Sequence, residues 1–137
     1  MKIMSVDYGD ARTGIAFCDV REMLASAYTV IKESYQPKLV ARLTEIIEKE
    51  KPGLVVIGLP RNMDGSYGFR AEKCRELGEA LSNEIDIPVE YEDERLTTVI
   101  AHDILSSNNV GGKRRKQTVD AVSATVILQS FIDKRKK

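Results

Sequence analysis

Four acidic residues stand where predicted strands or helices of this chain end or begin. Asp7 follows an apolar run, Asp93 and Glu94 follow another, and Asp120 opens the last helical stretch. Carboxylates that converge at strand ends and a helix N-terminus repel one another unless a cation joins them. Oxygen-only ligands favour Mg²⁺ or Mn²⁺. Two such ions about 4 Å apart activate water and stabilise the leaving oxygen in phosphodiester hydrolysis.

Each of these acids also has a purely structural explanation. Acidic residues are common at strand ends, and the helix dipole alone favours Asp120 in a first turn. Side chains alternate along a strand, so only one of Asp93 and Glu94 should point at the metals. The combination of positions, not any single one, indicates a metal site.

Residues 1–16 predict how Asp7 is positioned. An apolar run indicates a buried strand that ends at Asp7, and Gly9 and Gly14 let the chain turn back as a hairpin. A hairpin of this kind, strand–Asp–x–Gly, opens both the actin-like phosphotransferases and the RNase H-like nucleases. At 137 residues, the chain is expected to be one domain, residues 1–137, whereas the actin-like fold needs two such domains.

Apolar periodicity and turn residues predict the remaining elements. Three further strands are expected, over 27–31, over 54–57, and from 87 into 93–95. Four helices are expected, from Pro37 to Pro52, over 69–83, from Thr97 or Thr98 to Asn108, and over 117–134. The resulting order, β-β-β-α-β-α-β-α-α, is an α/β arrangement. It predicts the RNase H-like fold, a mixed five-stranded sheet with helices on both faces.

Two helices carry an apolar stripe that should face the sheet. In the helix over 69–83 the stripe is formed by Cys74, Leu77 and Leu81. In the last helix it is formed by three valines with two larger residues alongside, namely Val119, Val122, Val126, Ile127 and Phe131.

Composition and charge restrict the class of protein. No apolar run is long enough to span a membrane and no signal-peptide pattern is present, and the two cysteines are expected to be reduced and half-buried, so a cytoplasmic protein is predicted. The net charge is zero, so contacts with nucleic acid must come from local basic groups. A loop just before Asp120 carries the strongest candidates, Lys113, Arg114, Arg115 and Lys116. Arg70, Lys73 and Arg75 open the helix over 69–83, where an ordinary solvated face competes with phosphate binding.

Four motifs resemble the YqgF/RuvX family of RuvC-like Holliday junction resolvases, which is also assigned to pre-16S rRNA maturation. They are DYGDARTGIA (7–16), VIGLPRNMDGS (56–66), YEDERLTT (91–98) and KRRKQTVDAVSATVILQ (113–129). The resemblance implies a metal-binding set of Asp7, Glu94 and Asp120, with Asp93 as the rival of Glu94. General RNase H-like nucleases carry an acid after the fourth strand, where this chain has Gly58-Leu59-Pro60. The site must therefore be completed from the fifth strand.

The functional expectation is a Mg²⁺- or Mn²⁺-dependent endonuclease that acts in pre-16S rRNA 5′-end maturation. One alternative is a Holliday junction resolvase acting on branched DNA. Another, of a different class, is a non-catalytic module that binds nucleic acid or ribosome-associated proteins. Arg12 and Arg95 could hold a phosphate or form structural ion pairs. No membrane partner is expected, and the protein could be a monomer or a homodimer.

Overall fold

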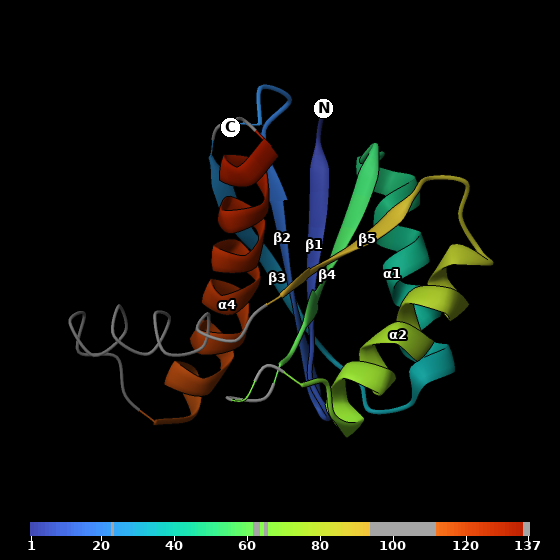
Figure 1. Ribbon diagram of the computed structural model, residues 1–137, viewed down its shortest axis with the longest axis vertical. Coiled ribbons are helices and arrows are strands. Elements are labelled where there is room, and N and C mark those ends of the chain that lie inside the picture. Colours follow the sequence, from blue (N-terminus) through green and yellow to red (C-terminus); the bar gives the residue numbers. More distant parts are fainter. Residues whose placement is uncertain (23, 62–63, 65, 94–111, 136–137) are drawn as a thin grey trace.

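Five strands form one mixed sheet in the order β3-β2-β1-β4-β5 (Figure 1). The structure is a computed structural model that describes residues 1–22, 24–61, 64, 66–93 and 112–135, with the backbone alone for 112–121. The strands are β1 (Ile3–Tyr8), β2 (Arg12–Cys18), β3 (Ala25–Lys32), β4 (Leu54–Leu59) and β5 (Val89–Asp93). β1 pairs antiparallel with β2 and parallel with β4, and β5 continues the parallel half. The predicted mixed five-stranded sheet is confirmed.

Helices cover both faces of the sheet, as predicted (Figure 1). Helices α1 (Gln36–Glu50) and α2 (Phe69–Ser82) lie on one face, and α4 (Gly112–Arg135) lies on the other. Alternate residues of β1 divide between the two cores. Met4 and Val6 belong to the cluster with α1 and α2, and Ile3 belongs to the cluster with α4. The helix expected between residues 97 and 108 falls outside the described residues.

The buried residues of α2 are those that the sequence predicted. Cys74, Leu77 and Leu81 are buried, and Ala71 joins them one turn earlier. The spacing of these residues at i, i+3, i+6 and i+10 keeps one stripe of the helix on the sheet. Cys74 and Cys18 are free cysteines that are buried, not half-buried as expected, and burial raises the pKa of the Cys18 thiol. They pack as small hydrophobic residues.

The predicted stripe of α4 is only partly right: Ile127 and Phe131 pack on the core as expected, but the valines do not form its centre. Ala124, Ile127, Leu128 and Ile132 are buried without any exposed surface, whereas the valines with described side chains, 122 and 126, are only half-buried. The helix approaches the sheet closely at Ala124, where the Ser5 hydroxyl donates a 2.7 Å hydrogen bond to the Ala124 carbonyl. A small residue permits that approach, and a search for large apolar residues overlooks it.

The basic run at 113–116 lies inside α4, not in a loop as expected. The glycines at 111–112 predict a loop that includes the basic residues. Lys and Arg are good helix formers, however, and nothing after Gly112 interrupts a helix. The four basic residues therefore form its first turn, and the expectation that Asp120 lies in the first turn is wrong, because the helix begins eight residues before it.

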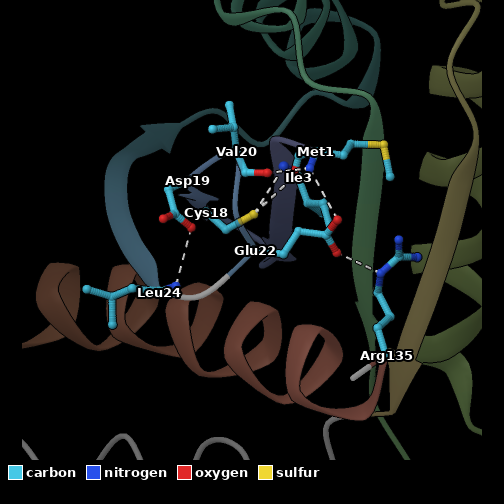
Figure 2. Close-up of polar contacts among 8 residues, drawn as sticks. All are labelled: Met1, Ile3, Cys18, Asp19, Val20, Glu22, Leu24 and Arg135. Carbon is cyan, nitrogen blue, oxygen red and sulfur yellow. Dashed lines mark hydrogen bonds and ion pairs between the residues drawn. The ribbon is translucent and has the colours of Figure 1, made fainter. Parts of the chain in front are cut away.

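Opposite the carboxyl ends of β1 and β4, polar contacts join the N-terminus to the last turn of α4 (Figure 2). The Met1 ammonium donates to the Val20 carbonyl at 2.6 Å and pairs with Glu22 at 3.2 Å. Arg135 at the end of α4 pairs with the other oxygen of Glu22 at 2.9 Å. Glu22 thus joins β1 to the last turn of α4. Within the described part of the chain, no helix is long and apolar enough to cross a membrane.

Candidate active site

The carboxyl ends of β1, β4 and β5 meet at one edge of the sheet because these strands are parallel. In open α/β sheets this edge is where ligands bind. The β1–β2 turn closes tightly there, since a Cβ at Gly9 would overlap the Arg12 carbonyl oxygen. Gly9 is therefore required by the turn, as predicted. Arg12 opens β2 beside the turn and is half-buried.

Asp7 lies on β1 with glycines on both sides. Its antiparallel partner on β2 is Gly14, and on β4 Gly58 follows Ile57, which pairs with Val6. The expectation that Gly14 belongs to the turn is wrong, because Gly14 lies inside β2. Cross-strand partners point to the same face of a sheet. The positions directly beside Asp7 on both neighbouring strands are therefore occupied by glycines.

Asp7 shares the α4 face of the sheet with Ile3 and Ser5, because alternate residues of a strand face the same way. Asp120 precedes Ala124 on α4 by four residues, and that helix runs opposite to β1 (Figure 1). Four helical residues advance about 6 Å and two strand residues about 6.6 Å. Since Ser5 contacts Ala124, Asp120 and Asp7 lie at about the same level along the sheet.

Asp93 is placed differently from Asp7. It pairs in register with Leu59, which belongs to the core under α1 and α2, so Asp93 lies on the opposite face from Asp7. One carboxylate oxygen is 3.0 Å from the Arg61 guanidinium, and the other accepts a 3.0 Å hydrogen bond from the Tyr67 hydroxyl. Both oxygens of Asp93 are therefore engaged by protein groups.

Glu92 is a buried acid that the sequence did not single out. It lies on the α4 face of β5 and is 6% exposed. Its carboxylate accepts hydrogen bonds from the Ser130 hydroxyl at 3.0 Å and from the Lys134 ammonium at 2.9 Å. These contacts join β5 to α4, and the Lys134 ammonium neutralises the buried charge of Glu92. Ser130 and Lys134 lie about forty residues further along the chain than Glu92, so no local sequence pattern indicates these contacts.

Arg70 joins the first turn of α2 to the carboxyl end of β1. Its guanidinium lies 3.0 Å from the Asp10 carboxylate and donates a 3.1 Å hydrogen bond to the Tyr8 carbonyl.

In the loop before α2, the Asp64 carboxylate accepts hydrogen bonds from the hydroxyl and the backbone N–H of Ser66. These bonds lower the pKa of Asp64.

The remaining predicted site residues fall outside the described side chains. Glu94 and Arg95 lie outside the described residues, and for Lys113, Arg114, Arg115, Lys116 and Asp120 only the backbone is described. Among the side chains that are described, no group of three metal-ligating residues comes together. The structure thus places Asp7 and the backbone of Asp120 at one level and puts Asp93 on the other face.

A family model described as "RuvX: Holliday junction resolvase" matches residues 1–134. The chain belongs to the RuvX family. The resemblance drawn from the four sequence motifs is confirmed. Of the two groups of proteins that open with such a hairpin, the RNase H-like nucleases are therefore the right one and the actin-like phosphotransferases are not.

Relatives and solved structures agree with this assignment to the RuvX family. A protein of Natranaerobius thermophilus named "Putative pre-16S rRNA nuclease" is 38% identical over 98% of this chain and 96% of its own length. One of Pelotomaculum thermopropionicum with the same name is 40% identical over 97% of this chain and 87% of its own length. The Thermus thermophilus RuvC in complex with Holliday junction substrate has a TM-score of 0.64 at 15% identity, and covers 99% of this chain and 96% of that one. This likeness confirms the RNase H-like fold.

Proposed function

We propose that this protein is a metal-dependent endonuclease whose active site is built on Asp7. The observation that carries the proposal is the position of Asp7 at the carboxyl ends of parallel strands, between Gly14 and Gly58 and at the level of Asp120. Relatives that match nearly the whole chain bear the name of a nuclease. The whole of residues 1–137 acts as one nuclease domain in this proposal.

The donor set fits a hard divalent cation. Asp7, Glu94 and Asp120 offer only carboxylate oxygens, the ligands that Mg²⁺ and Mn²⁺ prefer. The two glycines beside Asp7 add no side chain of their own on the α4 face. When bound, the ions supply activation of water and stabilisation of the leaving oxygen. The role of the protein is to hold the carboxylates and the scissile phosphate in line at this edge.

Glu94 is the middle carboxylate in this proposal. Its rival, Asp93, gives both oxygens to Arg61 and Tyr67 on the face away from Asp7. Successive residues of an extended chain face opposite sides, which favours the residue after Asp93 for the face of Asp7. Four basic residues open α4 within two turns of Asp120 and contact backbone phosphates, together with Arg12 and Arg95. They are Lys113, Arg114, Arg115 and Lys116.

The substrate we favour is precursor 16S rRNA, cut during 5′-end maturation in the cytoplasm in association with the ribosome. The names of the relatives support this choice. The second candidate is branched DNA, supported by the description of the family as a Holliday junction resolvase. Resolution of a junction requires a homodimer, because two strands are cut across a two-fold axis, whereas trimming of RNA requires only a monomer.

The test is cleavage of end-labelled precursor rRNA and of a four-way DNA junction, with Mg²⁺, Mn²⁺ or EDTA. Asp7→Asn, which keeps the size of the side chain, is the matched variant. We expect the wild type to cut the RNA with either metal and Asp7→Asn to lose this cleavage. Neither protein is expected to cut in EDTA. Paired symmetric cuts in the junction alone would establish the resolvase instead. Binding without cutting, unaffected by Asp7→Asn or EDTA, would leave a non-catalytic binding module.

A further inference from the structure

Two exposed aromatic rings stand at the start of α2, each with a cation over it. Phe69 is 71% exposed, and the Lys73 ammonium lies 5.2 Å from the centre of its ring. Tyr67 is 41% exposed, and the guanidinium groups of Arg61 and Arg75 lie 4.9 and 4.8 Å from its ring. A Phe with this exposure adds little to the core. Aromatic rings among cations are the means by which proteins stack unpaired bases while they hold phosphates.

A small cavity lies beside Lys73, the residue whose ammonium covers the Phe69 ring. It has a volume of about 90 Å³, on the scale of one phosphate group, and lies between the β1–β2 turn, Ser34 and the first turns of α2. Arg70 lines the cavity but is paired with Asp10 and with the Tyr8 carbonyl. Lys73 also lines it. Because Lys73 both covers the Phe69 ring and reaches the cavity, one nucleotide can contact the ring and the ammonium together.

The cavity lies at the same edge of the sheet as Asp7 but on the other face. Tyr8, which lines the cavity, follows Asp7 directly on β1 and packs against the core under α1 and α2, whereas Asp7 faces α4. The start of α2 lies at the same edge of the sheet as the ends of β1 and β4 (Figure 1). A nucleic-acid strand that passes over this edge from one face of the sheet to the other can therefore place one phosphate at Asp7 and another nucleotide on α2.

We infer that Phe69 and Lys73 form a binding site for an unpaired nucleotide of the substrate, called here the α2 platform. The base stacks on the free face of the Phe69 ring, and the Lys73 ammonium binds the adjacent phosphate at the mouth of the cavity. In a duplex both faces of each base are covered by its neighbours, so only an unpaired nucleotide offers its face to Phe69. The inference deepens the proposed nuclease function, on which it rests, by assigning it single-stranded segments as substrate.

The test measures binding without cleavage. Every variant is made in the Asp7→Asn background, and fluorescence anisotropy follows a labelled single-stranded RNA and the same sequence annealed into a duplex. Phe69→Ala is expected to weaken binding of the single strand about 5- to 100-fold and to leave duplex binding unchanged. Phe69→Trp, which keeps a stacking surface, is expected to restore binding.

Lys73 is tested by the salt dependence of binding. Lys73→Gln is expected to reduce the slope of log K against log [salt] by about one. Lys49→Gln is the matched control, because Lys49 is exposed on α1 away from the cavity. It is expected to leave the slope unchanged.

Each result decides the inference separately from the proposed nuclease. If Phe69→Ala binds the single strand as tightly as its parent, the α2 platform does not exist, whatever the protein cuts. If single strand and duplex weaken equally, the surface contacts the backbone alone and the assignment of unpaired bases is wrong. If the protein binds unpaired RNA through Phe69 but cuts neither substrate, the α2 platform is supported and the proposed nuclease function is wrong.

Discussion

Asp7 and Gly14 lie directly opposite each other in the antiparallel pair of β1 and β2. Because partners across strands project to the same face, any side chain at position 14 would stand beside the Asp7 carboxylate. We therefore expect Gly14→Ala to lower the rate of metal-dependent cleavage about 10- to 100-fold through displaced ligands or phosphate. Unfolding in urea, measured beside the kinetics, checks the fold. A variant that cuts as fast as the wild type would show that the space beside Asp7 is not used.

Asp7 and Asp93 are expected to respond differently to the same substitution. Asp7→Asn should reduce cleavage about 1,000-fold or more, equivalent to about 4 kcal/mol of transition-state stabilisation. Asp93→Asn removes only a surface ion pair with Arg61, which contributes at most about 1 kcal/mol to stability, and should leave cleavage within a few-fold of the wild type. Single-turnover rates at saturating Mg²⁺ measure both. Equal losses in the two variants would make Asp93 a metal ligand and displace Glu94 from the site.

The sequence predicted those features that local patterns encode. The buried stripe of Cys74, Leu77 and Leu81 follows from helical periodicity, and the position of Asp7 follows from an apolar run that ends in an acid. Features that depend on distant partners were not predictable. The close approach of Ser5 to Ala124 decides which face of α4 is buried, although 119 residues separate the two. Likewise, Phe69 could be recognised as exposed only once α2 was packed on the sheet.

In the candidate site, too, locally encoded features were predictable and features that depend on distant partners were not. The predicted strand end and helix start indicate that Asp7 and Asp120 can converge, but only Asp7 lies near the end of its element. Helix α4 begins at Gly112, so Asp120 lies two turns inside the helix and not at its start. The role of Gly14 was misread because a glycine near a turn is usually taken as part of it, whereas here the register places it two residues into β2. Register is a property of the pair of strands, so neither strand encodes it alone.

Thr13 carries a buried hydroxyl for which the described part of the chain offers no hydrogen-bond partner. Its neighbours across the sheet are Tyr8 and Ile31, both associated with the core under α1 and α2. Thr13→Val replaces the hydroxyl by a methyl group of similar size and should raise the free energy of unfolding by about 1 kcal/mol, because an unsatisfied polar group is no longer buried. Urea denaturation measures the change. A lower stability would mean that the hydroxyl is satisfied in solution, for instance by a bound water.

Glu22 forms a pH-dependent link between Met1 and the last turn of α4. Burial raises the pKa of this carboxyl, but the hydrogen bonds from the Met1 ammonium and from Arg135 outweigh that effect, and the pKa lies below its ordinary value. The folded state therefore binds the Glu22 proton less tightly than the unfolded chain does. The stability from this group is present above the unfolded pKa of about 4.3 and is lost as the pH falls through the folded pKa.

Glu22→Gln should accordingly lower the melting temperature at pH 7, where the wild-type carboxylate pairs with both cations. The difference between the two proteins should shrink in acid and vanish below the folded pKa, because the wild-type carboxyl is then also neutral. Glu45→Gln, at an exposed position of α1, is the control and should leave the melting temperature unchanged at every pH. Thermal unfolding followed by circular dichroism between neutral and acidic pH measures all three proteins. A difference between wild type and Glu22→Gln that stays constant with pH would show that the substitution acts through packing, not through the charge of Glu22.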